Sequence, residues 1–193
     1  LIGSPNADRL TGDGNANNLS SGLGNDTLDG GGGADTLTGG DGNDFYYIDH
    51  AGDLVSESNA AAAGGIDLVH STLASHTLGA NVENGRIMAT GAANLTGNTL
   101  NNLLYAGIGN NLLDGGAGSD TVTWAYAVSG ATGVTASLAT GTASGSGTDT
   151  LVGIEHLIGS PNADRLTGDG NANSLSGGAG NDTLDGGSGA DTL

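Results

Sequence analysis

Residues 3–47 read GSPNADRLT GDGNANNLS SGLGNDTLD GGGGADTLT GGDGNDFYY, five nonapeptides in succession without a gap. A second run of nonapeptides fills residues 88–123, and a third begins at Gly159 and continues to Leu193. All three follow the template G-G-x-G-x-D-x-U-x, in which U is a large apolar residue. Position 8 is apolar in all thirteen motifs. This internal repeat, more than the overall composition, decides the fold.

Each nonapeptide combines a turn with a short strand. The Gly-rich half can adopt positive φ and bring backbone carbonyl groups close together. The x-U-x half is a strand of about three residues whose middle side chain points inward. Two nonapeptides then make one flattened coil of 18 residues, and each motif lies beneath the next motif but one. The sequence thus predicts an all-β, parallel solenoid.

Two stretches, 48–87 and 124–158, leave the nonapeptide frame. Alternating and β-branched residues predict strands in and beside them, at 45–48, 66–69, 121–124 and 134–138, and only 59–63 hints at helix. We expect both spacers to continue the solenoid with longer loops. The predicted segments are a first repeat block (1–47), a spacer (48–87), an Asn-rich middle block (88–123), a β spacer (124–158) and a third block (159–193).

A longer period is superimposed on the nonapeptides. Residues 1–37 recur as 157–193 with only four differences, at an offset of 156 residues. This pattern predicts that the chain is a section of a longer protein and that the third block starts the next unit of a tandem array. Neighbouring tandem units are therefore expected partners.

The composition excludes several classes of protein. The chain has 3 Lys and Arg against 21 Asp and Glu, a net charge of −18, whereas nucleic-acid phosphates require clustered Lys and Arg. There is no cysteine, so neither disulfides nor thiolate metal sites can form. No apolar run is long enough for a membrane-spanning helix, and no signal peptide is visible. We expect neither nucleic-acid binding nor membrane insertion.

The carboxylates at position 6 fall into two ladders, one along each edge of the coil. Carboxylates stacked about 4.8 Å apart repel by about 3 kcal/mol at an effective dielectric constant of about 20. A calcium ion, with Ca–O distances of about 2.4 Å, reaches two such ligands at once, and turn carbonyls can complete its shell. One apolar side chain per nonapeptide is too little to order nine residues. We therefore predict a chain that is disordered without Ca²⁺ and folds on binding it.

The tandem motif, clearest at 30–38 and 177–185, resembles the RTX (repeats-in-toxin, haemolysin-type) calcium-binding nonapeptide family. The resemblance covers the three repeat blocks. It implies a right-handed parallel β-roll with Ca²⁺ in the turns and export in an unfolded state by type I secretion. It also implies folding in external calcium, so the expected localisation is extracellular or at the cell surface.

The resemblance assigns metal-ligand roles to position 6 of the motifs. Three pairs of position-6 residues stacked one coil apart have Asp on both levels: Asp8/Asp26, Asp26/Asp44 and Asp164/Asp182. Pairs that contain Asn lose a charge and should bind more weakly, and the middle block, which also has Ala93, either holds few ions or stacks Asn amides. The assigned residues are Asp8, Asp26, Asp35, Asp44, Asp120, Asp164, Asp182 and Asp191, together with Asn17, Asn102, Asn111 and Asn173.

Other polar residues are weaker candidates. Asp53 and Asp67 each precede Leu-Val and are secondary candidates for ligands in the spacer. No HExxH, GxSxG or Ser/His/Asp arrangement is present, so we predict no catalysis in this chain. Six turn carboxylates are expected to be mostly solvated, and four histidines to be surface or spacer residues. These are Asp13, Asp29, Asp41, Asp114, Asp169 and Asp185, and His50, His70, His76 and His156.

Three functions fit the sequence. The first is a structural repeat region of a large secreted or cell-surface bacterial protein, such as an adhesin, fibre or matrix component with surface or matrix ligands, which the tandem period favours. The second is the calcium-binding C-terminal repeat region of a type I-secreted enzyme, such as a protease, lipase or alginate-modifying enzyme. The third, an ice-binding solenoid, needs a flat ladder of Thr and Asx along one face; Thr recurs at position 7, but Arg9 and Asn18 interrupt it.

Overall fold

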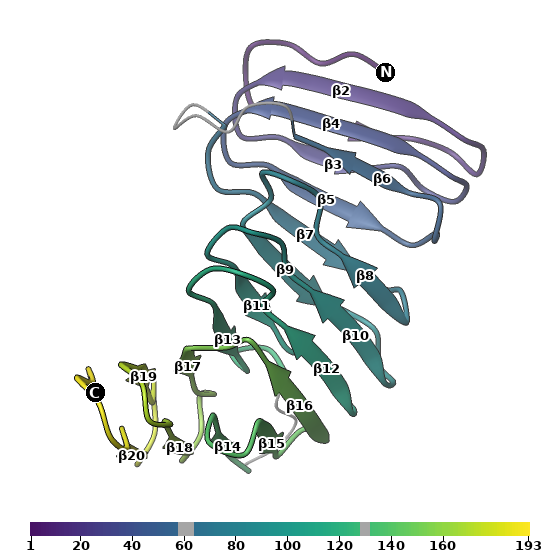
Figure 1. Cartoon of the computed structure of the whole chain (residues 1–193). Helices are drawn as coiled ribbons and strands as arrows, with labels where there is room; N and C mark the ends of the chain where they lie inside the picture. Colours follow the sequence, from purple (N-terminus) through teal and green to yellow (C-terminus); the bar gives the residue numbers. More distant parts are fainter. Residues whose placement is uncertain (58–63, 128–131) are drawn as a thin grey trace.

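A computed structural model of the chain describes residues 1–57, 64–127 and 132–193. These residues form twenty short strands and no helix. The helical tendency at 59–63 lies outside the described residues. Within them, no helix is long and apolar enough to cross a membrane. The strands stack from one terminus to the other, and the two termini lie at opposite ends of the stack (Figure 1).

One side of the coil is a parallel sheet of nine strands. Its strands are β1 (Arg9–Thr11), β3 (Thr27–Asp29), β5 (Phe45–Ile48), β7 (Leu68–Ser71), β9 (Asn84–Ile87), β11 (Leu103–Tyr105), β13 (Thr121–Thr123), β17 (His156–Ile158) and β19 (Ser174–Ser176). They are hydrogen-bonded in this order. Sheet neighbours are therefore separated by one return of the chain through the other side of the coil.

The other side is divided between two sheets. The first contains β2 (Asn18–Leu23), β4 (Thr36–Asp41) and β6 (Leu54–Ser56). The second contains β8 (Ser75–Thr77), β10 (Ala93–Thr96), β12 (Asn111–Asp114), β14 (Thr135–Ser137), β15 (Thr142–Ser144), β16 (Thr148–Val152), β18 (Arg165–Thr167) and β20 (Thr183–Asp185). Its order is β20-β18-β14-β15-β16-β12-β10-β8.

The register confirms the predicted coil of two nonapeptides. Leu10 of β1 lies opposite Leu28 of β3, and Leu28 lies opposite Tyr46 of β5, so each step is 18 residues (28 − 10 and 46 − 28). The same step separates Leu157 of β17 from Leu175 of β19. The prediction of an all-β parallel solenoid is therefore confirmed.

The core is a thin stack of the apolar side chains at position 8. Leu19, Leu28 and Leu37 are completely buried, and the same cluster continues to Leu166 and Leu175. Each coil adds only two or three such side chains, because each short strand points one residue inward. The apolar core is therefore thin, as the sequence predicts.

The spacers take part in the same sheets, with one arrangement that the sequence did not predict. β14 pairs with β15, and β15 with β16, in antiparallel orientation, so a small meander replaces a regular turn of the coil. The predicted strand at 66–69 begins two residues later, at Leu68, because Asp67 belongs to the turn and accepts a backbone hydrogen bond from Asp44.

Candidate calcium sites

A ladder of acidic and amide side chains runs along one edge of the coil. It is formed by the residue immediately before each strand of the nine-stranded sheet. Three of its members, Asp67, Glu83 and Glu155, come from the spacers. The others are Asp8, Asp26, Asp44, Asn102, Asp120 and Asn173.

In this ladder, one carboxylate oxygen accepts a hydrogen bond from a backbone N–H of the level before it. The backbone N–H of Asp8 donates to Oδ1 of Asp26 (2.8 Å), and that of Asp26 donates to Oδ1 of Asp44 (2.7 Å). The N–H of Asp44 donates in turn to Oδ1 of Asp67 (2.8 Å). The structure thus brings the predicted pairs Asp8/Asp26 and Asp26/Asp44 together, one coil apart.

The same bond recurs further along this edge. The N–H of Asn102 donates to Oδ1 of Asp120 (2.7 Å), and the N–H of Asp120 donates to Oε2 of Glu155 (2.8 Å). At the C-terminal end, the N–H of Asn173 donates to Oδ1 of Asp191 (2.9 Å). Carboxylates from repeat and spacer therefore play the same structural part.

A second ladder lies along the opposite edge. The N–H of Asn17 donates to Oδ1 of Asp35 (2.8 Å), and the N–H of Asp35 donates to Oδ1 of Asp53 (3.0 Å). Asp53, a secondary candidate in the sequence, thus occupies a position equivalent to position 6. Asp164 and Asp182 are joined by the same bond (2.9 Å).

The second oxygen of several carboxylates is buried and unpaired. Oδ2 of Asp26, Asp35, Asp44 and Asp120 has no hydrogen-bond partner among the residues that the structure describes. These four side chains are at most 1% exposed. Burial of an ionised oxygen without a partner is costly, and protein interiors supply either a donor or a cation at such points. These atoms fit a cation ligand.

Glycine at position 1 leaves room beside these oxygens. A Cβ added to Gly30 would collide with Oδ2 of Asp35. One added to Gly115 would collide with Oδ2 of Asp120 and with the carbonyl oxygen of Gly153 on the next level. Side-chain and carbonyl oxygens therefore converge where only glycine fits. A set of hard oxygen ligands of this kind suits Ca²⁺.

Some ladder carboxylates are instead satisfied by the protein. Asp164 accepts from the backbone N–H (2.6 Å) and hydroxyl (2.8 Å) of Ser160, one with each oxygen. Asp149 accepts the N–H of Asn111 on Oδ1 (2.9 Å) and the indole N–H of Trp124 on Oδ2 (2.8 Å). The potential ligands are thus not equivalent along the coil.

The middle block differs in the same way. Oδ1 of Asn102 accepts the N–H of Asn98 (2.8 Å), and its Nδ2 donates to the carbonyl oxygens of Val82 (3.1 Å) and Glu83 (3.0 Å). Protein groups therefore satisfy this amide without an ion. Asn111 is also buried, but neither of its side-chain polar atoms has a partner within the described ranges.

The remaining candidates lie nearer to solvent. Asp8, Asn17, Asp182 and Asp191 are half-buried at the ends of the two ladders. Oδ2 of Asp8 accepts the N–H of Ser4 (2.5 Å). Levels in the interior of the coil therefore offer more enclosed oxygen sites than those at its ends.

Burial shifts the carboxyl groups of the first ladder. Desolvation raises the pKa of Asp44 to about 6, and the charge of Asp26 adds to this effect. Desolvation, with the charges of Asp44 and Glu83, raises the pKa of Asp67 to about 7. Burial also raises the pKa of Asp120 and of Asp149. In each case burial disfavours the ionised form of the carboxyl group.

The turn carboxylates outside position 6 bind their own turns. Oδ1 of Asp13 accepts the N–H of Asn15 (2.9 Å), and this hydrogen bond lowers the pKa of Asp13. Asp169 accepts the N–H of Asn171 in the same way (2.8 Å), with the same effect on its pKa. Such carboxylates stabilise the turn conformation.

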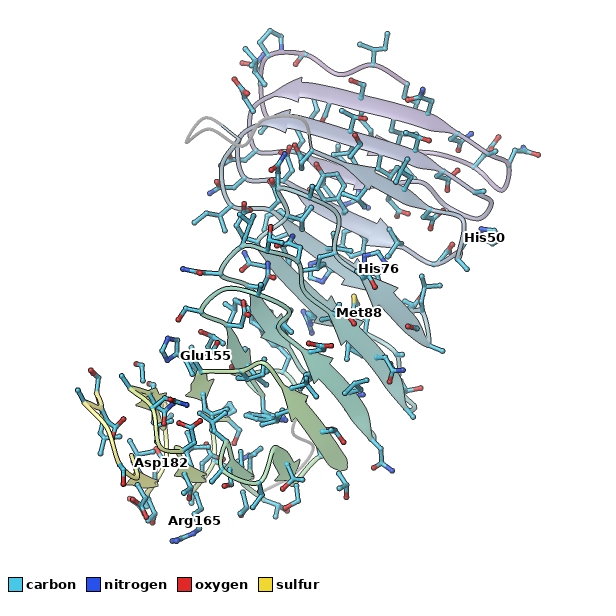
Figure 2. The ribbon with its side chains drawn as sticks, in the orientation of Figure 1. His50, His76, Met88, Glu155, Arg165 and Asp182 are labelled. Carbon is cyan, nitrogen blue, oxygen red and sulfur yellow. The ribbon has the colours of Figure 1, made fainter. Side chains whose placement is uncertain are left out.

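The histidines are not gathered at a metal site. His70 is 7% exposed and stacks on Tyr47, with ring centroids 4.8 Å apart, and burial lowers its pKa to about 4. His156 hydrogen-bonds the Ser119 hydroxyl through Nε2 (2.8 Å) and accepts the N–H of Ser174 on Nδ1 (2.9 Å). His50 projects away from the coil (Figure 2).

Sequence reasoning missed four acidic residues. Asp149 and Glu155 precede Thr150-Leu151 and His156-Leu157, so the rule of an acid before x-U could have found them. Glu83 precedes Asn84-Gly85, which lacks the apolar residue, and no local signal marks it. Glu57 lies next to Asp44 and Asp67, and these residues form the only group of three or more His, Cys, Asp or Glu residues spaced for one metal ion in the part of the chain described.

Comparison with known proteins identifies the repeats. The family model of the RTX calcium-binding nonapeptide repeat matches in four copies, at residues 1–28, 11–46, 90–123 and 158–193. These matches together span more than half of the chain. A comparison with curated proteins found no match.

Proposed function

Because the chain belongs to the RTX calcium-binding nonapeptide repeat family, we propose that it is a structural section of a large secreted or cell-surface bacterial protein that folds on meeting external calcium. Calcium binding follows from the family itself. Secretion, the coupling of binding to folding, and a role as an extender in an adhesin, fibre or matrix component are the proposed part.

The observation that carries the proposal is the set of buried, unpaired carboxylate oxygens. Asp26, Asp35, Asp44 and Asp120 each hold one backbone amide and direct a second oxygen to a point with no donor among the described residues. In a coil built in this way, each added level contributes more negative charge than apolar contacts. Calcium, when bound, supplies the positive charge and bridging ligation that this arrangement lacks.

We propose a ranking of the position-6 residues as ligands. Asp26, Asp35, Asp44 and Asp120 rank first because their free oxygens are enclosed. Asp164 ranks lower because both of its oxygens accept hydrogen bonds from Ser160. Asn102 ranks lowest because its amide is already paired. The half-buried residues at the coil ends lie between these extremes.

Coupling to folding would serve export. In the low calcium of the cytoplasm, unneutralised ladders would keep the chain extended, and external calcium would close the coil. The 156-residue recurrence of residues 1–37 supports an array, since stacked solenoid units lengthen a rod without new contacts elsewhere.

The direct test is circular dichroism during a calcium titration of the purified chain, reversed with EGTA. We expect a disordered spectrum in EGTA and a cooperative gain of β signal as calcium is added, lost again on chelation. Magnesium at the same concentration should be a poor substitute, because it is smaller and dehydrates reluctantly. A full β signal in EGTA would reject the coupling of binding to folding.

A further inference from the structure

Glu57 occupies a special position in the coil. Gly39 and Glu57 are 18 residues apart (57 − 39), so Glu57 lies one level after Gly39 at the position where the motif has its first glycine. β6, which precedes Glu57, pairs with β4, which precedes Gly39, at the same step. The first spacer therefore places a carboxylate side chain where regular levels present a glycine.

That side chain turns inward. Glu57 is 7% exposed, and its Oε1 accepts a hydrogen bond from the Tyr46 hydroxyl. Its Oε2 accepts the backbone N–H of Gly40 (3.3 Å). A Cβ added to Gly39 would meet the Tyr46 hydroxyl, Oδ2 of Asp44 and Oε1 of Glu57 together. The three polar groups thus converge on one point.

Two ladder carboxylates lie close to the Glu57 side chain. Ligand oxygens of Asp44, Glu57 and Asp67 all lie within 4.8 Å of one another, and Asp44 and Asp67 are 0% and 1% exposed. Oδ2 of Asp44 has no hydrogen-bond partner in the described ranges, whereas Oδ1 of the same side chain accepts the backbone N–H of Asp26. The Asp44 carboxylate, one oxygen of which is buried and unpaired, therefore lies beside two further carboxylates.

The electrostatics point in the same direction. Desolvation raises the pKa of Glu57 to about 8, and the charges of Asp67 and Asp44 add to it. The charges that raise the pKa values of Asp44 and Asp67 also belong to other carboxylates. Any two oxygens within 4.8 Å of each other can contact one ion at Ca–O distances of about 2.4 Å.

We infer that Asp44, Glu57 and Asp67 together bind one hard divalent cation, with Ca²⁺ as the natural occupant, in a three-carboxylate site that the nonapeptide motif does not encode. The inference rests on the proposed function, because the ladders must close to assemble the site. Three charges in place of two make it the tightest site of the chain, since calcium affinity rises with ligand charge. It lies where the first repeat block meets the first spacer.

Calorimetric calcium titration of the whole chain, compared with Glu57→Gln, tests the inference. The substitution keeps the shape and the acceptor for Gly40 but removes one charge. We expect that the tightest class of sites in Glu57→Gln binds one ion fewer than in the wild type, or binds calcium about tenfold more weakly. The control is Asp29→Asn, which also removes one negative charge but at a turn carboxylate outside both ladders, and it should leave the tightest class in place.

Unchanged stoichiometry and affinity in Glu57→Gln would overturn the three-carboxylate site, whereas failure of the wild type to bind calcium or to gain β signal would overturn the proposed function instead. If Glu57→Gln does not fold at saturating calcium, Tyr46→Phe replaces it as the test. This variant keeps the core ring and removes only the hydroxyl that holds Glu57. It should weaken the tightest class several-fold, and an unchanged class would reject the site.

Discussion

At the scale of single residues, the two carboxylate oxygens of Asp26 have different surroundings. Oδ1 of Asp26 caps the backbone N–H of Asp8, and its Oδ2 is available to an ion. The side chain of Asp29, three residues further on, accepts the N–H of Gly31 within its own turn (3.2 Å). The two aspartates are near in sequence but have very different surroundings.

We therefore predict unequal effects of alanine at these two positions. Asp26→Ala removes a ligand and leaves a backbone amide unpaired, a loss of about 1–3 kcal/mol, and should raise the calcium midpoint of folding by about an order of magnitude. Asp29→Ala should move the midpoint little. The measurement is circular dichroism against free calcium, and equal shifts in the two variants would contradict the assignment.

Most of the ladder could be predicted at this scale, but not all of it. The pairing of Asp8 with Asp26 follows from the 18-residue step alone. The approach of Asp67 to Glu57 could not be predicted, because the loop after β6 changes the step to 23 residues between Asp44 and Asp67. The bond from Trp124 to Asp149 also depends on how the second spacer folds back.

At the scale of turns and strands, the glycines of one turn are required for different reasons. A Cβ at Gly30 would collide with the Asp35 side chain, whereas one at Gly32 would meet only the Cα of Gly14, at 3.9 Å. Neither glycine has positive φ; that conformation belongs to Gly31 (75°) and Gly33 (113°). Gly30 and Gly32 therefore make a matched pair that separates crowding at the ligand from backbone strain.

Gly30→Ala should raise the calcium midpoint clearly, by at least several-fold, because the methyl group occupies the space beside Oδ2 of Asp35. Gly32→Ala should be close to neutral. Calcium-dependent circular dichroism of both variants checks this. A neutral Gly30→Ala would show that the space beside position 1 is not used for binding.

Strand direction is what the sequence could not supply at this scale. Val134 to Leu138 alternates as a strand should, and β14 forms there. Alternation is the same for parallel and antiparallel neighbours, so it could not indicate that β14 turns back into β15. The reversal depends on a tight turn in which Gly141 has φ of 64° and donates its N–H to the carbonyl oxygen of Leu138 (3.2 Å).

At the scale of the whole molecule, the net charge of −18 opposes closure of the coil. Burial raises the pKa of Asp44 to about 6, of Asp67 to about 7 and of Glu57 to about 8, from ordinary values of 3.8 for Asp and 4.5 for Glu. The folded coil thus binds protons more tightly than the unfolded chain does. These three groups contribute metal-free stability that is present at low pH and is lost as pH rises from about 4 to about 8, whereas burial of His70, which lowers its pKa to about 4, acts in the opposite direction below its ordinary value of 6.5.

Acidification should therefore replace part of the effect of calcium. In metal-free buffer, lowering the pH from 8 to about 5 should increase the β signal in circular dichroism. With saturating calcium, the same change should not increase it, because protons and calcium compete for the same oxygens. A metal-free β signal that is unchanged or falls on acidification would contradict these shifts.

The ladder hydrogen bonds all point the same way along the coil. The N–H of one level donates to the carboxylate of the next, from Asp8 to Asp26 to Asp44 and again from Asn173 to Asp191. A cut across any such level would expose donors on one face and acceptors on the other. The rod accordingly has polarity, and stacked copies can continue the ladder head to tail but cannot do so with two like faces together.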